Sequence, residues 1–507
     1  MTRAIAPALP EKPGLHPLRQ SLRNSQLARW IKARPILRGF TLIVWRILGR
    51  LYHLMMALLR APLTVLLAPF LACLYLATLL PPRKVARNRS RDPASRQIVM
   101  LVISEVFRDP RVEREARALA GAGFPVKILY PDYFSFHHDV GEIDWGPGIT
   151  FAPLPRWIAT YVHNFPYVFS IHYLWAAIKE RPFAFHAHDL STAMVGMAAA
   201  RFTRVHCVCD FHEWYSENVS WDSYSERYVP HPRHVRFVYS RVERLAMRQA
   251  SAVITVCDSI ARELERIGGG RRQVEVIRNI PSLTRPSALR CQPLRQELGL
   301  GPDRFILLYQ GGTGPTRLLE PVIEAIALVP AAVLVIRGPG IEHYGPGYHE
   351  LAARLNILDR VFCLPPVPSD QVVDAAAGAD AGIWTLPNLS KNFYFALPNK
   401  LFEYMAAGLP ILGAHFPEAR KLIEGLDIGH CFDPYDPESI AAALRRLVDD
   451  PNRVSQIRQR MPGALASIDA SAEWTKLVDI YRALDADPDA LRGSSAGPPS
   501  GHPTHVE

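Results

Sequence analysis

Residues 397–412 combine the residue types that bind a nucleoside diphosphate. The stretch reads LPNKLFEYMAAGLPIL. Asn399 is expected to cap a short helix that Gly408 ends, because asparagine favours helix starts and glycine favours the position just after a helix. An anion near Asn399 and Lys400 would meet free backbone N–H groups and an ammonium. One turn further on, Glu403 offers a carboxylate that accepts from paired hydroxyls, such as those of a ribose. The alternative is an ordinary solvated loop, helix and carboxylate.

Histidines and carboxylates gather at the ends of two expected strands, FHAHDL and CDFHE. The first group is His186, His188 and Asp189, and the second is Asp210, His212 and Glu213. Their spacing matches no usual zinc pattern, so we predict a polar active site without a metal. A single histidine at a strand end is more often a satisfied polar residue, but two such groups together favour a site.

Two strand-to-helix turns add further candidates. The loop SEVFRDPRVEREA carries Asp109 and Arg111 at a helix start, where doubly wound sheets place their ligands. It lacks the glycine fingerprint of dinucleotide sites, so nicotinamide chemistry is not indicated. In the second half of the chain, Gly311 and Gly312 would let a phosphate approach the backbone, and Arg317 could neutralise it. Glycines at such turns are also often purely conformational.

These residues belong to two successive runs of alternating strands and helices, separated by a linker rich in Pro, Ser and Arg. Apolar runs such as QIVMLVI and RFILLYQ are typical of buried parallel strands. The predicted fold class is therefore α/β, with two doubly wound domains. The predicted segments are a head (1–96), a first domain (97–285), a second domain (286–470), a terminal helix (471–485) and a disordered tail (486–507).

The head differs from the body in charge and hydropathy. Of the net charge of +10, the first 97 residues contribute 17 Lys and Arg against two acids, so the body is mildly acidic. This disfavours nucleic-acid binding and suits the head to an anionic membrane surface. Residues 61–80 are uncharged and long enough to cross a bilayer. Basic residues flank both sides, so a span, a re-entrant hairpin and a buried globular hairpin all remain open.

The cysteines bear on the compartment. Seven are scattered along the chain without a C-x-x-C pair, which fits a reduced, cytosolic setting. Together with the head, this predicts a location at the cytoplasmic face of the cell membrane, either anchored or peripheral.

Taken together, the motifs resemble a family-4 glycosyltransferase of the GT-B fold, the group 1 type. The resemblance runs from about residue 97 to 484 and rests on RDPRVEREARALAGAGF, FHAHDL, CDFHE, VIRNIP, YQGGTG, RGPG and above all LPNKLFEYMAAGLPIL. It implies two Rossmann-like domains that face each other across a cleft, with a nucleotide-sugar donor held mainly by the second. It also implies that the helix at 471–485 crosses back onto the first domain, and that transfer retains the anomeric configuration.

The resemblance assigns roles to individual residues. Arg317 resembles the basic residue on the donor pyrophosphate, and Glu403 matches the second acid of the family's acid pair, which binds the ribose. His212 looks like the histidine that faces the donor sugar, where its backbone or ring would stabilise developing positive charge. The expected catalytic residues are His212, Arg317 and Glu403. The expected donor-binding residues are Gly311, Gly312, Arg317, Asn399, Lys400 and Glu403. The expected acceptor-side residues are Asp109, Arg111, His188, Asp189 and Glu213.

The sequence departs from the family pattern at two places. The first acid of the pair would fall at position 395, which is Phe395, so its contact with the sugar is lost or supplied by another group. The basic residue that often follows the first glycine of the second domain is replaced by Gly312. Arg317 and Lys400 would then carry the pyrophosphate charge between them.

We therefore expect an enzyme that moves a sugar from a UDP- or GDP-linked donor to an acceptor hydroxyl, in polysaccharide or glycolipid synthesis at the membrane. No cofactor is expected; the partners are the nucleotide sugar, a glycan or lipid-linked acceptor, and the membrane. Two alternatives are a non-catalytic scaffold of the same fold, which the replacement at Phe395 would suit, and a sugar-nucleotide epimerase. Assays of transfer, hydrolysis and epimerisation separate the three.

Overall fold

The computed structural model describes residues 85, 93–103, 106–131, 144–155, 166–222, 227–270, 272–281, 294–368, 371–468 and 470–487. The apolar segment predicted at 61–80 and nearly all of the predicted tail lie outside these residues. No helix in the described ranges has both the length and the apolar character needed to cross a bilayer.

The first domain is built on a seven-stranded, wholly parallel sheet with the strand order β3-β2-β1-β4-β5-β8-β9. Every residue of its central strands is buried, as expected where helices cover both faces of a parallel sheet. The strands are β1 (Ile98–Leu101), β2 (Val126–Pro131), β3 (Ile149–Leu154), β4 (Ala184–His188), β5 (His206–Phe211), β8 (Ala252–Thr255) and β9 (Glu275–Val276).

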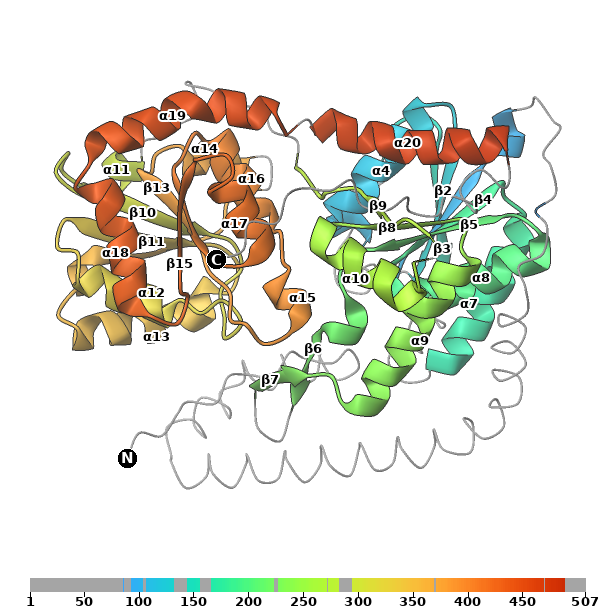
Figure 1. The fold of residues 1–507 in the computed structure, drawn as a ribbon, viewed down its shortest axis with the longest axis horizontal. Helices are drawn as coiled ribbons and strands as arrows, with labels where there is room; N and C mark the ends of the chain where they lie inside the picture. Colours follow the sequence, from blue (N-terminus) through green and yellow to red (C-terminus); the bar gives the residue numbers. More distant parts are fainter. Residues whose placement is uncertain are drawn as a thin grey trace, which may run out of the picture.

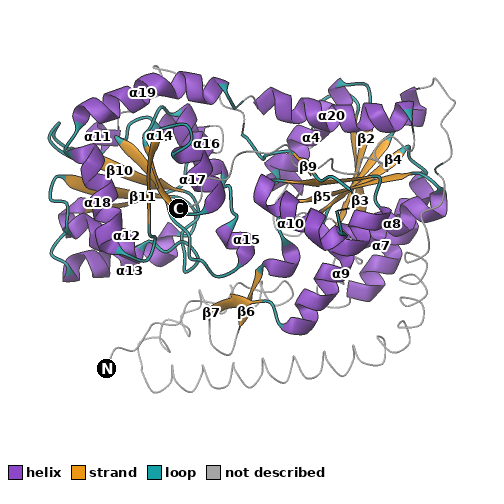
Figure 2. Ribbon diagram, in the orientation of Figure 1, coloured by secondary structure: helices purple, strands orange, loops and turns teal. Residues whose placement is uncertain are grey.

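Helices cover both faces of this sheet (Figure 2). They are α4 (Pro110–Gly121), α7 (Pro166–Glu180), α8 (Asp189–Thr203), α9 (Arg233–Gln249), α10 (Asp258–Gly268) and α20 (Ala470–Ala486). Although α20 ends the described chain, it lies beside α4 over the first domain (Figure 1). Its apolar residues, among them Leu477 and Tyr481, are buried in the same core cluster as Ile98 and Val126. A short antiparallel ribbon of β6 (Val219–Asp222) and β7 (Arg227–Pro230) extends from this domain.

The second domain has a six-stranded parallel sheet with the order β12-β11-β10-β13-β14-β15. This is the 3-2-1-4-5-6 order of doubly wound folds, in which ligands bind beyond the carboxyl ends of the strands. The strands are β10 (Phe305–Gln310), β11 (Ala332–Arg337), β12 (Val361–Leu364), β13 (Ala381–Trp384), β14 (Ile411–Ala414) and β15 (Gly429–Phe432). The α/β class and the two Rossmann-like domains predicted from the sequence are confirmed.

The helices of the second domain are α11 (Leu294–Glu297), α12 (Glu320–Ala327), α13 (Ile341–Arg354), α14 (Val372–Ala376), α15 (Lys391–Tyr394), α16 (Asn399–Ala406), α17 (Pro417–Ile423), α18 (Pro437–Val448) and α19 (Pro451–Ala466). Buried residues from all six strands and from these helices other than α15 form one core cluster, against which Phe393 of α15 packs. From α19 the chain passes into α20 and so returns to the first domain (Figure 1).

The two domains touch through a few specific contacts beside the cleft. The backbone N–H of Ser259, on α10, donates to Oε1 of Glu418, on α17, at 2.8 Å, and Lys421 of α17 pairs with Asp258 of α10. The short helix α15 lies between the domains in Figure 1 and approaches residues 215–217 of the first. These contacts hold the carboxyl ends of the two sheets toward a shared cavity.

Candidate active site

A cavity of about 460 Å³ opens at the carboxyl ends of β10, β11 and β13. This volume suits a medium-sized ligand. Its lining mixes apolar residues with cationic and acidic ones; the polar and glycine members are Glu213, Gln310, Gly311, Arg317, Arg337, Gly338, Asn392, Asn399, Lys400 and Glu403. Glu213 belongs to the first domain and the others to the second, so the cavity spans the cleft.

Helix α16 brings three of the predicted donor-binding residues to this cavity. The helix starts one residue earlier than expected from a capping asparagine: Pro398 occupies the N-cap position, and Asn399 is the first helical residue without a side-chain cap bond. The prediction that Asn399 caps the helix is therefore wrong. Proline favours this edge of a helix because its fixed φ and missing N–H cost nothing there. The first turn of the helix still lines the cavity through Pro398, Asn399, Lys400 and Glu403, and the N–H groups at such a helix start have no partner within the helix. The helix ends before Gly408, whose φ of 73° is in the left-handed region, as predicted.

Lys400 is held by the strand beneath it. Its Nζ donates to the Tyr309 hydroxyl at 2.8 Å, and the same hydroxyl donates to the carbonyl of Gly312 at 2.7 Å. Burial, with help from the nearby positive charge of Arg317, lowers the pKa of Lys400 to about 7. An ammonium with so low a pKa gains much from an anionic ligand, because the ligand restores the charge that burial disfavours.

Gly311 makes room for this lysine. A Cβ at Gly311 would lie 2.1 Å from Lys400 Cε and 2.5 Å from its Nζ, and the φ of Gly311 is 140°. Only glycine fits both constraints. Gly312, by contrast, lies outside the cavity lining and has open space at its Cβ position. Of the two predicted glycines, Gly311 therefore lines the cavity. Gly312 does not, and its carbonyl accepts the hydrogen bond from Tyr309.

Arg317 and Glu403 line the cavity, and neither is held in an ion pair within the described residues. Within the described residues, Arg317 pairs with no carboxylate; its Nη1 contacts the carbonyl of the neighbouring Thr316 at 3.2 Å. Glu403 is partly buried, and burial raises its pKa, opposed by the charges of Lys400 and Arg114. An arginine without an acidic partner and a carboxylate one helical turn from Lys400 are free to serve a ligand.

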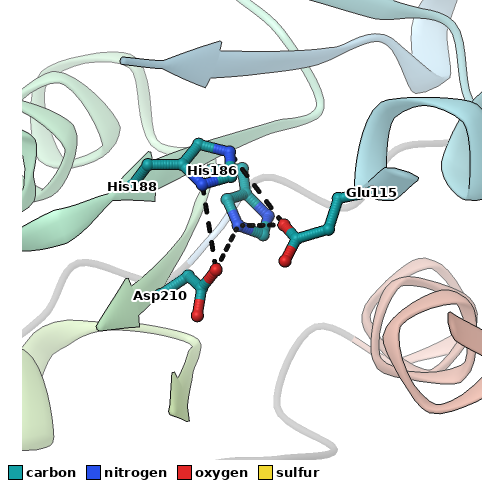
Figure 3. A group of neighbouring side chains, drawn as sticks. All are labelled: Glu115, His186, His188 and Asp210. Carbon is teal, nitrogen blue, oxygen red and sulfur yellow. Dashed lines mark ion pairs between the residues drawn. The ribbon is translucent and has the colours of Figure 1, made fainter. Parts of the chain in front are cut away.

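Near the strand ends of the first domain lies a fully buried ionic network. Arg111, on α4, bonds both oxygens of Asp210 at 2.9 Å each and the carbonyl of Ile277 at 2.9 Å. It also lies 2.9 Å from Glu115. The Nε2 of His186 approaches Glu115 at 3.2 Å, as Figure 3 shows, and its Nδ1 contacts the Tyr481 hydroxyl on α20 at 2.7 Å. The network therefore links the strand ends to the helix that returns from the second domain.

His212 lies at the edge of this network; its side chain is 17% exposed, and it is not among the residues that line the cavity. Its Nε2 lies 3.0 Å from Asp210, and its Nδ1 lies 3.3 Å from Asp189. These two carboxylates outweigh the effect of burial and raise the pKa of His212 to about 9. A ring that carries a proton on each nitrogen is an imidazolium, which would repel developing positive charge. Of the two predicted means of stabilising such charge, the ring is therefore disfavoured, and a role of the His212 backbone stays a prediction.

Glu115, His186, His188 and Asp210 include the donor types of a transition-metal site, and their ligand atoms all lie within 4.8 Å of one another. The guanidinium of Arg111, however, already lies 2.9 Å from both Glu115 and Asp210. Arg111 and a proton on His186, whose pKa the two acids raise to about 9, together neutralise the two carboxylates. The four residues thus fit a charge-balanced structural network without further cations.

The other residues predicted on the acceptor side lie at the starts of helices or inside the first domain. Asp109 caps α4, accepting from the backbone N–H of Arg111 at 3.2 Å. His188 is buried, with its Nδ1 at 3.3 Å from His212, and burial lowers its pKa. Asp189 starts α8 with a φ of 67°, a strained conformation of the kind that clusters at functional sites. Arg111 is 1% exposed and its partner Asp210 is fully buried, so the predicted acceptor-side residue Arg111 lies inside the domain and not on a ligand-binding surface.

Some residues of the site were missed by the sequence reasoning. Glu115 lies on the buried face of α4 with Arg111, Val112, Ala116 and Leu119. Two charged residues on an otherwise apolar helical stripe were a usable signal of a buried ion pair. Tyr481 offered none, because its partner is 295 residues away in sequence. Gln310 and Arg337 end two adjacent strands, where a polar residue after an apolar run was again a signal.

Two family models match the chain and together cover most of it. The model described as a glycosyl transferase 4-like domain matches residues 109–279, and the one described as glycosyl transferases group 1 matches residues 292–462. The first match lies within the first Rossmann-like domain and the second within the other. They meet between β9 and α11, where the chain leaves the first sheet.

Among curated relatives, the D-inositol 3-phosphate glycosyltransferase of Thermomonospora curvata is 27% identical over 215 residues, which is 40% of this chain and 48% of that protein. The enzyme of the same name from Streptomyces scabiei is 24% identical over 393 residues, 74% of this chain and 82% of that one. The chain thus spans about half the length of the first of these relatives.

Solved structures agree with the fold. Sucrose-phosphate synthase from Thermosynechococcus elongatus superposes with a TM-score of 0.60 at 18% identity, covering 77% of this chain and 99% of that one. The Anabaena protein HepE, solved in complex with UDP-glucose, gives a TM-score of 0.57 at 18% identity, covering 76% and 98%. Likeness at this level of identity establishes a shared two-domain architecture.

Proposed function

The chain belongs to the group 1 glycosyltransferases, and from this premise we propose that it transfers a sugar from a UDP- or GDP-linked donor to an acceptor hydroxyl with retention of configuration. The observation that carries the proposal is the cavity between the domains. There Arg317, Lys400, Glu403 and the start of α16 line the same cavity. Two cations and a helix N-terminus suit a diphosphate, and a carboxylate beside them suits the ribose hydroxyls.

In the proposed reaction, the bond between the anomeric carbon and the diphosphate breaks while negative charge builds on the leaving phosphate. Arg317 and the first N–H groups of α16 stabilise that charge, and Lys400 adds an ammonium. Lys400 is most useful when the diphosphate is bound, because the anion raises the pKa that burial has lowered. Retention requires the acceptor hydroxyl to attack from the face that the diphosphate leaves.

The strand ends of the first domain would receive the acceptor. His212 lies there with Asp189, and both side chains are partly exposed; the hydrogen bond from His212 to the buried Asp210 fixes its position. In this proposal the imidazolium orients Asp189 and does not act as a base. The acceptor hydroxyl proton passes to a phosphate oxygen of the leaving group, which is the acceptor of protons nearest the attacking oxygen on that face.

We further propose that the acceptor is a glycan or lipid-linked sugar made at the cytoplasmic face of the cell membrane. The support is in the sequence: the first 97 residues are strongly basic and include twenty uncharged residues at 61–80. A basic and apolar segment of this kind binds anionic lipid surfaces. The HepE structure, with UDP-glucose bound, makes UDP-glucose a reasonable first donor to test.

The test is to incubate purified full-length protein with UDP-glucose, UDP-N-acetylglucosamine, UDP-galactose and GDP-mannose, each with and without a membrane lipid extract. We expect one donor to release its nucleoside diphosphate with label appearing in a glycolipid or glycan, and magnetic resonance to show the donor's anomeric configuration kept. Interconversion of sugars without an acceptor would support the epimerase alternative. Donor binding without turnover would support the scaffold.

A further inference from the structure

Phe395 stands where the family resemblance expects the acid that contacts the donor sugar, and the structure gives it a different use. Its ring stacks on that of Trp214 from the opposite domain, with centroids 6.1 Å apart and planes 10° from parallel. Its carbonyl also accepts from the Cys257 thiol of the first domain at 3.4 Å. Phe395 thus faces the first domain and not the donor cavity, whose lining does not include it.

Trp214 is held to the second domain by more than the stack. Its backbone N–H donates to Oδ1 of Asn392 at 2.8 Å, and Asn392 is itself buried. The ammonium of Lys391 lies 5.5 Å from the centre of the indole. A stack, a buried hydrogen bond and a cation–π contact on one residue make an interdomain clasp formed by Trp214, Lys391, Asn392 and Phe395.

The clasp fixes the residue before Trp214, which is Glu213. Glu213 lines the donor cavity with Arg317 and Glu403. Its side chain remains open to solvent, yet protein surrounds it closely enough that burial raises its pKa, with a contribution from Asp189. Asn218 donates a hydrogen bond to its Oε2, which leaves Oε1 free of protein donors among the described residues and able to accept from a ligand.

We propose that Glu213 takes the place of the missing acid: it accepts hydrogen bonds from hydroxyls of the donor sugar, across the cleft from the diphosphate site. This inference rests on the proposed function. The diphosphate site lies in the second domain, so a sugar attached to the diphosphate extends toward the first domain, where Glu213 lies. The acid that family members carry on the second domain is thus supplied here from the facing one.

Two consequences follow for the donor. Recognition of the sugar depends on the clasp, because Glu213 reaches the cavity only while Trp214 is docked on Asn392 and Phe395. A carboxylate at this position also selects the sugar class: a neutral sugar with free hydroxyls can donate to it, whereas a uronic acid would bring a second negative charge. The expected donor is therefore a nucleotide-linked neutral sugar.

The test measures what the sugar adds to nucleotide affinity. Calorimetry on the full chain would compare UDP with UDP-glucose and GDP with GDP-mannose, and the ratio of the two dissociation constants in a pair is the gain from the sugar. Glu213→Gln should reduce this gain about tenfold, the effect of losing a charge-assisted hydrogen bond, and leave the affinity for UDP or GDP unchanged. UDP-glucuronate should bind wild type more weakly than UDP-glucose, and Glu213→Gln should narrow that difference.

The matched control is Glu217→Gln, four residues along the same loop, where the carboxylate pairs with Arg236 outside the cavity. It should preserve the gain from the sugar. Phe395→Leu provides a second test, since it removes the stack but leaves Glu213 intact; it should lower the gain without affecting UDP affinity. If Glu213→Gln keeps the full gain in affinity from the sugar, the proposed role of Glu213 is wrong, while the proposed function still stands. Failure of wild type to bind either UDP or GDP would overturn the proposed function, and this inference with it.

Discussion

The ammonium of Lys400 lies 2.8 Å from the hydroxyl of Tyr309 and 4.2 Å from the centre of its ring. This contact seats a lysine of low pKa at the start of α16, against the end of β10. A hydroxyl and an aromatic face neutralise no charge, so the ammonium stays without an acidic partner in this contact. Tyr309 therefore positions the ammonium of Lys400 without neutralising it, so that the charge can bind an anionic ligand.

The affinity for a nucleotide sugar should depend on pH through Lys400. Its pKa is lowered to about 7 in the free protein, and a bound diphosphate raises it again. Below pH 7 the lysine is already charged and affinity is at its full value; above pH 7 binding must take up a proton. We expect the affinity for UDP-glucose to fall by up to about tenfold per pH unit between pH 7 and 8.5. Titration calorimetry in buffers of different ionisation enthalpy measures the proton uptake directly.

The control for this dependence is Lys400→Arg, which keeps a positive charge that does not titrate in this range. Its affinity should be flat from pH 6 to 8.5, whatever its absolute value. An equally steep pH profile in Lys400→Arg would mean that another group takes up the proton.

Replacing Gly311 should disturb the donor site through Lys400. The Cβ of Gly311→Ala would lie 2.1 Å from Lys400 Cε, at a φ that L-residues avoid, so the lysine must leave its seat on Tyr309. We expect UDP-glucose affinity to fall by about tenfold or more, the value of one charged contact. Gly347→Ala, on α13 with open space at its Cβ position, is the matched control and should bind as wild type does. Equal affinity in the two variants would contradict the close approach.

Tyr481→Phe should destabilise the first domain. It removes the hydroxyl that contacts His186 Nδ1 at 2.7 Å in a fully buried setting and leaves that nitrogen unpaired, at a cost of about 1–3 kcal/mol. For a domain of this size, we expect the melting temperature to fall by about 2–10 °C. The control is Tyr435, whose hydroxyl accepts from the exposed backbone N–H of Asn388 at 2.7 Å. Because this side chain is 51% exposed, water can replace the hydroxyl in Tyr435→Phe, which should melt within about a degree of wild type. Similar melting of both variants would show that α20 does not anchor the network.

The buried histidine should also make stability depend on pH. Glu115 and Asp210 raise the pKa of His186 to about 9, above its value of about 6.5 in the unfolded chain. A raised pKa stabilises the fold fully below pH 6.5, and this contribution is lost as the pH rises through 9. The lowered pKa of Lys400 has the opposite effect on the free energy of unfolding, which it increases as the pH rises above 7. The contribution of His186 is therefore measured as the difference in unfolding free energy between wild type and a His186 variant. The stability gap between wild type and His186→Gln should narrow from pH 6.5 to 9, by chemical denaturation; a constant gap would refute the charged state of His186.

Several parts of the fold and site could be predicted because the signal was local. The parallel strands follow from unbroken apolar runs such as Phe305–Gln310, and the end of α16 follows from Gly408. Arg317, Lys400 and Glu403 come together because strand ends and helix starts of a doubly wound sheet meet at one edge. Residues close in sequence, or placed by a repeated topology, are visible to sequence reasoning.

What could not be predicted depends on contacts between distant segments. The ring of Phe395 was visible as a departure, but its partner Trp214 lies 181 positions earlier, on the other domain. Arg111 can be buried because its guanidinium donates to Asp210 on β5 and to the carbonyl of Ile277. Both partners lie far from Arg111 in sequence. The start of α16 was predicted one residue too late. Asparagine is a common N-cap residue, but Pro398 occupies the N-cap position here and Asn399 is the first residue of the helix.

The most direct test of the central claim, glycosyl transfer from a nucleotide sugar bound at Arg317 and α16, is the turnover of Arg317→Gln. With the donor identified in the panel and a labelled sugar, wild type should transfer label to the acceptor, and Arg317→Gln should transfer at least about a hundredfold more slowly while melting at the same temperature. Arg304→Gln, on the surface of the same domain, should match wild type. Wild-type turnover by Arg317→Gln would contradict the account.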